Sequence, residues 1–490
     1  MNQRVEIVIA GVGASTRRSD EEPRGDAVAL MVEAARRALG AAGSGPVPRA
    51  VANLVDQVIV AQGSWSLGDP AALVAQACGI VGARMVLADL GVLQTSLIGR
   101  AVADVAAGRS QATLVAGGEA RRRAADRRRA GLDADETVQD DAVPDEHIRP
   151  AELVISRLEI DTGMVAAVEH YALIDSARSA AAGRSAAERR AEIDRLWLHQ
   201  ARGAADNPYA WEPDAEARLA DEGWGRPLAS PYHARHVTQW NVDQAAAVLV
   251  TSAATARAGG FDPAAVVEIR SVIGADLVVP VSERADIGRC PALSEIARAM
   301  DSSAVPVAAV DHWDLYSCFP VAVELQVAEL GLAAAPPSRT GGMTFGGGPF
   351  NNAALGALVR LVEVVQAEGG IAAVTALSGM ATKQGVVVVA PVGADRGDVG
   401  TWVVDVTERA AATTGRVEAV APAAVVGPAT VAAATVVFDR EGPGRALAVL
   451  DVSGGRTLAA STDAAAIDHV LAGASVGAAA RIGPDGAFVI

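Results

Sequence analysis

The order of the apolar segments constrains the fold of this chain most. Strand-like and helix-like segments alternate up to about residue 120, and the same order returns after about residue 241. Buried strands joined by helices are typical of parallel sheets that are covered on both faces. The alternation predicts an α/β architecture with a doubled core. The strand-like runs of the first part are residues 5–13, 55–63, 83–91 and 111–120.

Two segments far apart in the chain have the same internal order. Residues 85–108 and residues 341–365 each combine a strand, a glycine-containing turn and a helix of small residues, and a strand follows each of them. The two segments share few identical residues, so the evidence for a duplication is order and spacing. We expect two similar halves that pack against each other.

Composition and length indicate how these halves are packed and divided. The chain has 490 residues, of which 51% are hydrophobic but only 3% aromatic, so small side chains must fill the core. Small side chains favour closely spaced layers of helices and sheets. We expect a first half at 1–120, an inserted helical domain at 121–240, a second half at 241–395 and a β-rich domain of hairpins at 396–490.

Charge and cysteine content exclude several classes of protein. The net charge of −16 argues against a nucleic-acid binder, because neutralising phosphates requires a basic surface. Residues 400–490 contain no lysine and few aromatic residues, which argues against oligonucleotide binding there as well. Three scattered cysteines predict neither a disulfide framework nor a zinc site, and a reducing cytoplasm suits them. No apolar run is long enough to predict membrane insertion.

The glycine-rich stretch RTGGMTFGGGPFNN, residues 339–352, is the strongest local candidate for a ligand site. It leads into a helix-like segment, and a loop that opens a helix can bind an anion with its backbone N–H groups. A tight strand-to-helix turn without a ligand would need similar glycines, and the stretch alone does not separate the two interpretations.

The arginine-rich run at 119–131 is a second candidate that stays open. Its arginines point all round a helix and an acidic segment follows at once, which is typical of a solvated, self-neutralising surface. A contact to the phosphates of a nucleotide ligand is the alternative.

Three stretches of the chain form a recognisable set: the segment VTQWNVDQAAAVLVTS after the insertion, the run DLYSCFPVAVELQVAELGL and the turn GGP at 347–349. Together they resemble the thiolase superfamily over about residues 1–391. The second resembles the His-Asp-Cys-Phe motif of sterol-carrier-type thiolases, and the third resembles the family's Gly-His-Pro turn. The resemblance implies a duplicated, five-layered αβαβα fold with an inserted helical loop domain and a small C-terminal β domain of OB-like type.

The residues at the expected catalytic positions differ from those of active thiolases. In the family a thiolate, activated by a nearby base, carries the acyl group. By resemblance, Gly91 stands at the nucleophile position, Gly348 at the histidine of Gly-His-Pro, and Tyr316 with Ser317 at the first two positions of the His-Asp-Cys-Phe motif. Ser378 stands in the segment that should carry the second cysteine. We expect no thiolase chemistry from these residues, and we read Cys318 as a buried structural thiol.

The resemblance further implies a pocket for coenzyme A or an acyl-CoA, with no metal and no permanently bound cofactor. We expect the ligand to be contacted by Gly347, Gly348, Pro349, Asn351, Tyr316, Cys318, Phe319 and His312. Relatives without the catalytic cysteines are often named acetyl-CoA acetyltransferase. An active acetyl-CoA C-acyltransferase of lipid metabolism, using non-standard residues, is the alternative function. The C-terminal domain is a candidate docking surface for a protein partner.

Overall fold

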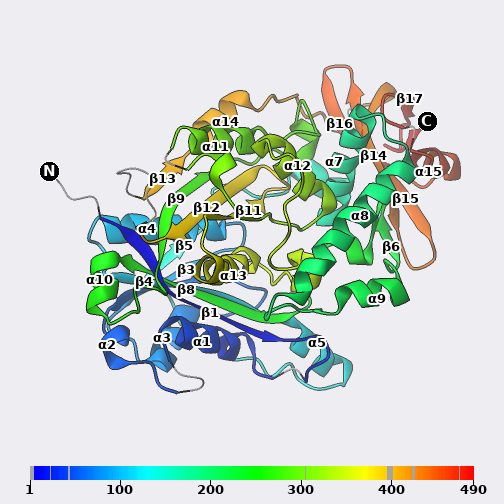
Figure 1. Cartoon of the computed structure of the whole chain (residues 1–490). Helices are drawn as coiled ribbons and strands as arrows, with labels where there is room; N and C mark the ends of the chain where they lie inside the picture. The colour runs from blue at the N-terminus through cyan, green and yellow to red at the C-terminus, as the bar shows by residue number, and fades with distance from the viewer. Residues whose placement is uncertain are drawn as a thin grey trace.

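The chain folds around one large mixed sheet, with a second sheet at its C-terminal end (Figure 1). This computed structural model describes residues 5–22, 24–41, 45–303, 305–393, 401–421, 425–473 and 475–490. The strand order of the large sheet is β10-β11-β12-β9-β1-β8-β4-β2-β3-β5, and β13 pairs with β9. Its strands are β1 (Ile7–Arg17), β2 (Val55–Ala61), β3 (Arg84–Ala88), β4 (Ala112–Ala120), β5 (Glu146–Ile148), β8 (Asp243–Ser252), β9 (Val267–Ala275), β10 (His312–Asp314), β11 (Ala372–Ser378), β12 (Lys383–Pro391) and β13 (Trp402–Asp405).

The strands of the first third run in one direction, as their alternation with helices predicted. β2 pairs in parallel with β3 and β4. The alternation did not predict that β8, which follows the insertion, enters between β1 and β4 and is antiparallel to both. A strand that returns after a long insertion can enter the sheet from either end, so its direction is decided by the path of the insertion.

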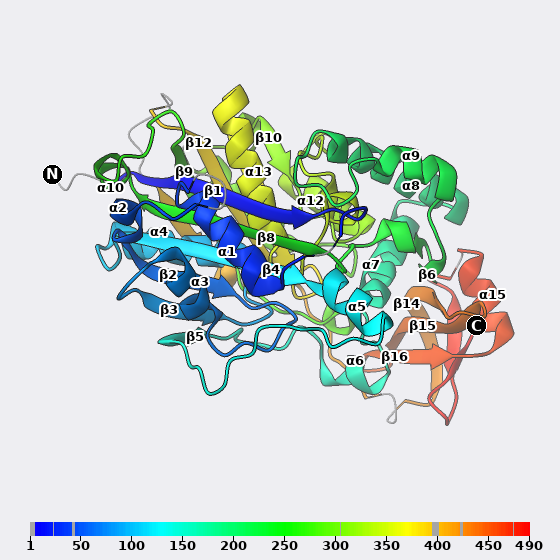
Figure 2. The same cartoon turned by 90° about the horizontal axis from the view of Figure 1, so that it is seen from below.

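Two helices lie in the middle of the molecule. α4 (Gln94–Ala106) and α13 (Ala353–Glu368) share one apolar cluster with strands of both halves of the large sheet. A second cluster joins the N-terminal strands to α1 (Ala27–Ala38) and α3 (Pro70–Cys78) on their outer face. A third joins the C-terminal strands to α11 (Pro291–Asp301) and α12 (Pro320–Leu330). The order is therefore helix, sheet, helix, sheet, helix, which is the five-layered αβαβα arrangement (Figures 1 and 2).

Short-range signals explain where several of these helices begin and end. Asp69 accepts a hydrogen bond from Ala72 N at the start of α3, Pro70 occupies its first turn, and Gly79 ends it in a left-handed conformation with φ of 70°. These are the residue types that satisfy or tolerate free helix ends. The remaining short core helices are α2 (Arg49–Ala52) and α10 (Ala253–Ala258).

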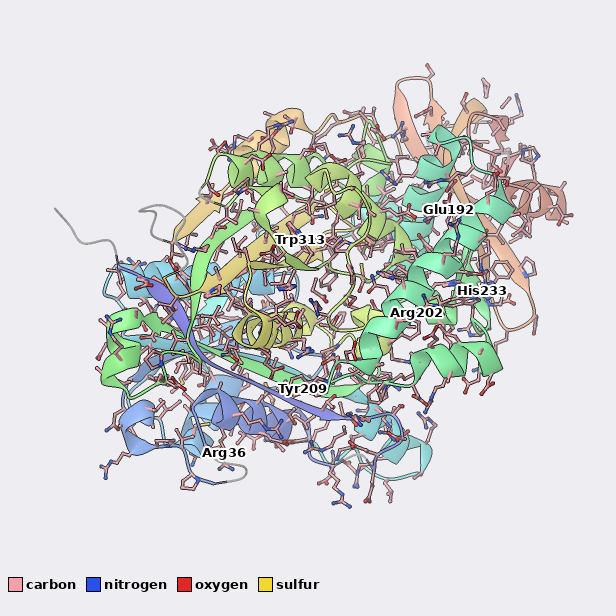
Figure 3. All side chains as sticks on the ribbon, viewed as in Figure 1. Arg36, Glu192, Arg202, Tyr209, His233 and Trp313 are labelled. Atoms are coloured by element: carbon pink, nitrogen blue, oxygen red, sulfur yellow. The ribbon has the colours of Figure 1, made fainter. Side chains whose placement is uncertain are left out.

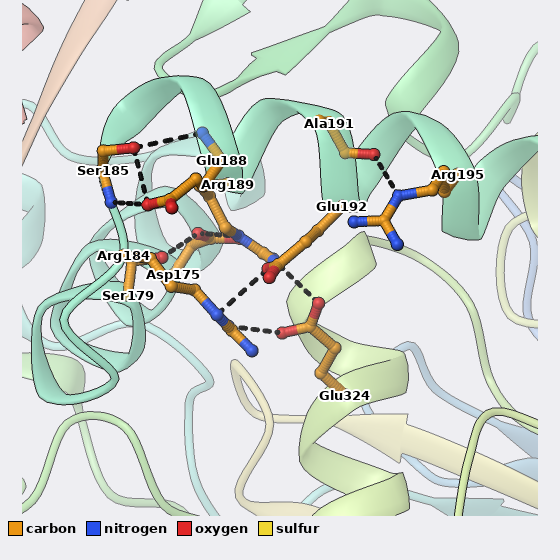
Figure 4. A network of polar contacts seen from close by, with 10 residues as sticks. All are labelled: Asp175, Ser179, Arg184, Ser185, Glu188, Arg189, Ala191, Glu192, Arg195 and Glu324. Carbon is orange, nitrogen blue, oxygen red and sulfur yellow. Dashed lines mark hydrogen bonds and ion pairs between the residues drawn. The ribbon is translucent and has the colours of Figure 1, made fainter.

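The segment between β4 and β8 is mostly helical and lies beside the core (Figure 2). Its long helices α7 and α8 are attached to α12 by a buried ionic network, drawn in Figure 4, in which Arg189 binds both Asp175 and Glu324. Arg189 is 3% exposed. The elements of this segment are α5 (Arg121–Arg129), α6 (Arg157–Asp161), α7 (Ala167–Ala181), α8 (Ala186–Ala205), α9 (Ala215–Glu222), β6 (Pro227–Ala229) and β7 (Tyr232–His233).

The C-terminal part folds into its own small sheet with strand order β16-β15-β14-β17-β18. β6 of the inserted segment pairs with β14, so this sheet also holds the insertion. Its elements are α14 (Thr407–Thr413), β14 (Gly427–Phe438), β15 (Pro443–Val452), β16 (Gly455–Ser461), α15 (Ala464–Leu471), β17 (Ala479–Ile482) and β18 (Phe488–Val489).

Candidate functional site

A small cavity of about 60 Å³ lies where the glycine-rich turn meets β1, β8 and the end of β10. Tyr209, from the inserted segment, also lines it, and Figure 3 labels this residue together with Trp313, the neighbour of Asp314 on β10. The polar groups of the lining come from Ser15, Thr16, Asn207, Tyr209, Gln244, Asp314, Tyr316, Thr340, Asn352 and Thr375. The lining of the cavity therefore includes both apolar residues and these polar side chains.

Asp314 is the acidic group of this cavity. Its carboxylate accepts hydrogen bonds from Ser338 Oγ at 3.2 Å, Arg339 N at 3.1 Å and Thr340 Oγ1 at 3.0 Å. Burial outweighs these hydrogen bonds and raises the pKa of Asp314 to about 6. Near neutral pH this carboxyl can therefore take up or release a proton.

Two buried side-chain oxygens of the lining lack a donor among the described residues. Gln244 donates through Nε2 to Gly346 O at 2.8 Å and to Tyr209 O at 3.0 Å, and its Oε1 has no partner. Asn352 Oδ1 also has no hydrogen-bond partner. Buried acceptors are normally paired, so this cavity presents two acceptors to a ligand or to water.

Gly347 is required at this place by Gln244. A Cβ at Gly347 would lie 2.2 Å from Gln244 Oε1, and Gly347 has a φ of 99°. The glycine-rich stretch therefore serves a close approach between the turn and β8. Gly347, Pro349 and Tyr316 are the three predicted contact residues that line the cavity.

Gly348, where the resemblance expects the histidine of the Gly-His-Pro turn, does not line this cavity. A Cβ at Gly348 would lie 2.3 Å from Thr238 Cγ2 and 3.2 Å from Met343 Cβ. Thr238 belongs to the segment by which the insertion rejoins the core. A histidine at 348 therefore meets a side chain of the inserted segment before it can reach the cavity.

Gly91, to which the resemblance gives the nucleophile position, lies in the turn before the first central helix. α4 begins at Gln94 with Leu93 as its N-cap. Leu93 packs with Ala354, Ala376 and Tyr316 in a small apolar cluster. The side chain at the helix start next to the cavity residue Tyr316 is thus an aliphatic one.

Gln94 connects the starts of the two central helices. Its Nε2 donates to Asn351 Oδ1 at 2.7 Å, and its Oε1 accepts from Ala354 N at 3.2 Å, in the first turn of α13. A free N–H at a helix start is an anion-binding group, and here a neutral amide already occupies it. Sequence reasoning missed Gln94, although a polar residue at the start of an apolar helix is a usable signal.

Gly91 and Ser378 meet at a buried lysine outside the cavity. Lys383 is the only lysine of the chain. The rest of its 42 Lys and Arg residues are arginines. Its Nζ donates to Gly91 O at 2.9 Å and pairs with Asp276 at 2.5 Å. Ser378 lies opposite Lys383 in the β11–β12 pairing. The four expected catalytic positions therefore do not lie together at one site. Tyr316 lines the cavity, whereas Gly91 and Ser378 lie near Lys383.

Comparison with known proteins decides the family. Residues 405–487 match the model of the thiolase-like protein type 1 additional C-terminal domain. The whole chain superposes on a monomeric SCP2-thiolase-like protein type 1 from Mycobacterium smegmatis with a TM-score of 0.77 and 25% identity, covering 100% of this chain and 99% of the other. The chain belongs to the thiolase superfamily. It carries the additional C-terminal domain of type 1 thiolase-like proteins.

Other solved structures share the fold of this thiolase-superfamily chain. The human mitochondrial 3-ketoacyl-CoA thiolase in complex with CoA has a TM-score of 0.54 at 15% identity, covering 80% of this chain and 99% of the other. The Ltp2-ChsH2(DUF35) aldolase has a TM-score of 0.58 at 18% identity, covering 79% and 98%. No curated protein matches the sequence. These identities support the fold and leave the activity open.

The three thiols of this thiolase-superfamily chain are buried and unreactive in character. Cys78, Cys290 and Cys318 are all free and buried. Burial raises the pKa of Cys78 to about 11 and that of Cys290 and Cys318 to about 12. A thiol needs its thiolate form to attack a thioester, so all three lack the property of a thiolase nucleophile at neutral pH.

The other predicted contact residues lie beside the cavity without lining it. Phe319 stacks on Tyr171 with ring centroids 4.3 Å apart, next to Cys318. His312 binds Gly369 O at 3.1 Å and Arg339 Nη2 at 2.9 Å. Asn351 donates to Gln62 O at 3.1 Å. None of these residues is part of the cavity lining.

The arginine run forms α5, and several of its arginines have acidic partners, while Arg123 is buried. Arg123 pairs with Asp135 at 2.9 Å, and Arg129 pairs with Asp126 at 2.7 Å. The described residues hold no group of three or more His, Cys, Asp or Glu side chains suited to a metal ion. Among the described helices, none combines the length and apolar character needed to cross a membrane.

Proposed function

We propose that this chain is a thiolase-like protein that binds coenzyme A or an acyl-CoA but does not catalyse thiolysis or condensation. The observation that carries the proposal is Leu93, an apolar side chain at the start of α4 that is packed against Tyr316, Ala354 and Ala376. An aliphatic side chain cannot form a thioester. Thr238 occupies the space that a side chain at position 348 would need, so a catalytic histidine has no room there either.

The cavity suits the acyl or thioester end of such a ligand. About 60 Å³ admits a small group and not a nucleotide, so the adenosine part would lie outside. The unpaired oxygens of Gln244 and Asn352 offer acceptors for N–H or S–H donors of the ligand. Binding by shape and hydrogen bonds needs no nucleophile.

An active acetyl-CoA C-acyltransferase that uses non-standard residues is the second candidate. Asp314 favours it, because a buried carboxyl with a pKa of about 6 in the cavity is suited to proton transfer near neutral pH. Against it stands the lack of an activated thiol, since the pKa of Cys318 is raised to about 12. Both candidate functions require binding of a CoA ligand, and only the acyltransferase would turn it over.

Calorimetry with coenzyme A and acetyl-CoA, beside a thiolysis assay with acetoacetyl-CoA, separates these candidates. We expect binding without turnover. Gly356 lines the cavity on α13, and a Cβ there meets no atom within 4 Å, so Gly356→Leu should fill the space and abolish binding. Ala367→Leu, on the exposed last turn of the same helix, is the matched control. Binding that survives Gly356→Leu would refute the assigned site, and turnover would favour the acyltransferase.

The C-terminal domain and the cellular setting complete the proposal. Three strands in series, a helix and two further strands, in the order β16-β15-β14-β17-β18, support an OB-like identification. We assign this domain to docking of a protein partner. The three free cysteines suit a reducing cytoplasm, and a CoA ligand suits lipid metabolism. Pull-down with the full chain and with residues 1–404 tests whether the domain binds a partner.

A further inference from the structure

A second cavity, of about 280 Å³, lies between α11, the segment before it and the end of α14. Among the described residues, none lines both this cavity and the one at the glycine-rich turn. Its apolar walls are Leu277, Ala285, Pro291 and Ala292, its basic groups are Arg284, Arg289 and Arg298, and its acidic group is Asp286. A volume of this size admits a small organic molecule.

Arg284 is the unusual group of this cavity. It is 2% exposed, and Nε donates to Val279 O at 3.0 Å while Nη2 donates to Met380 O. Nη1 has no hydrogen-bond partner among the described residues, and the carboxylate of Glu159 acts on Arg284 by its charge without a direct contact. A guanidinium stays charged in proteins, and a buried cation without an anion is costly. An anion at Nη1 would remove that cost.

The other two arginines already have acidic partners. Arg289 binds Glu329 through two contacts of 2.6 and 3.0 Å, and Arg298 binds Glu295. Glu329 also accepts from Cys290 N and from Ser294, so it fills the start of α11. The helix start is therefore not the anion site. Of the three basic groups in the lining, Arg284 alone remains unmatched among the described residues.

The additional C-terminal domain builds one wall of this cavity. Thr413, Thr414 and Gly415 line it, and they lie within the residues that match the domain model. Ala285 N donates to Gly415 O at 3.0 Å, and Arg456 donates to Arg284 O. The domain thus closes the cavity and holds the backbone that carries Arg284.

We propose that this cavity binds a small organic carboxylate with an apolar body, whose carboxylate pairs with Arg284 Nη1. The apolar walls receive the body, and Arg284 receives the charge. The site is separate from the proposed CoA cavity and gives the C-terminal domain a role in forming a second ligand site.

Thermal-shift and calorimetric titration of the full chain with acetate, butyrate, hexanoate and inorganic phosphate tests this proposal. We expect butyrate or hexanoate to bind and raise the melting temperature. Arg284→Met, which keeps the bulk and removes the charge, should weaken that binding at least tenfold. Ala285→Trp changes an exposed residue of the lining and should block the cavity without disturbing the fold. Arg257→Met, an exposed arginine of α10 outside the lining, is the control.

The outcomes distinguish the proposal from its alternatives. Loss of carboxylate binding in Ala285→Trp, with coenzyme A binding unchanged, supports a second site. Failure of all three carboxylates to bind, or binding that Ala285→Trp leaves unchanged, overturns the proposal. Binding of phosphate without the carboxylates overturns the assigned ligand class. If Arg284→Met does not fold, Ala285→Trp still decides.

Discussion

Replacing Asp314 with asparagine should change how the stability of this protein depends on pH. Asp314 is 5% exposed, and one carboxylate oxygen, Oδ2, accepts from Ser338, Arg339 and Thr340. An asparagine can present its carbonyl oxygen to the same three donors. The substitution therefore keeps most contacts and removes the ionisation.

The magnitude follows from the pKa of this carboxyl in the folded and unfolded chain. Its pKa rises from 3.8 to about 6 on folding because of burial. A carboxyl with a raised pKa favours the folded state below the unfolded pKa, and this advantage is lost as pH rises from about 4 to about 6. A pKa difference of about 2 corresponds to about 3 kcal/mol, of which about 2 kcal/mol is lost between about pH 4.5 and pH 7.5. The stability of Asp314→Asn does not fall in this pH range, because asparagine does not ionise.

Urea unfolding of both proteins at several pH values measures the effect. The stability of Asp314→Asn relative to the unchanged protein should rise by about 2 kcal/mol from about pH 4.5 to pH 7.5. Asp221→Asn, at an exposed carboxylate on α9, is the control and should leave the pH profile unchanged. A constant difference for Asp314→Asn across this range would refute the argument that burial controls this carboxyl.

Three further predictions concern buried groups. Arg189→Met breaks the network of Figure 4 and should lower the free energy of unfolding, measured in urea, by about 3–5 kcal/mol. An unchanged midpoint of the urea unfolding curve would contradict this prediction. Lys383 is 1% exposed, so an amine-reactive label should modify the folded chain at its α-amino group alone, as read by mass spectrometry; labelled Lys383 would show that its burial is wrong. Leu93→Ala should cost about 2–5 kcal/mol without yielding thiolysis, and a cost below about 1 kcal/mol would speak against its packed position.

Much of the fold was predictable from local pattern. The strand-like runs at 83–91 and 111–120 contain β3 and β4, and the apolar helix after 341–352 is α13. Strand and helix periods are properties of neighbouring residues, so the sequence displays them directly. The glycine-rich stretch makes a close approach to β8, where the partner of Gly347 is Gln244, and the sequence alone did not identify this partner.

The candidate site was predictable only in part. Tyr316, Gly347 and Pro349 line the cavity, whereas Asp314 and Gln244, which give it its polar character, were not predicted. Gln244 comes from β8, far from the turn in the chain, and strand pairing alone brings it there. Gly91, to which the resemblance gives the nucleophile position, lies in the turn before α4 and does not line the cavity.

The sequence by itself determined the α/β layers and placed Gly91, Tyr316, Gly348 and Ser378 where the resemblance expects catalytic groups, because these depend on residue type and short-range order. The tertiary structure alone decided which side chains occupy the space at those positions. Leu93 packs at the start of α4, Thr238 lies where a side chain at position 348 would extend, and Arg284 Nη1 has no hydrogen-bond partner among the described residues. These facts depend on contacts between segments distant in the chain, and burial by such contacts sets the pKa values and the open hydrogen bonds.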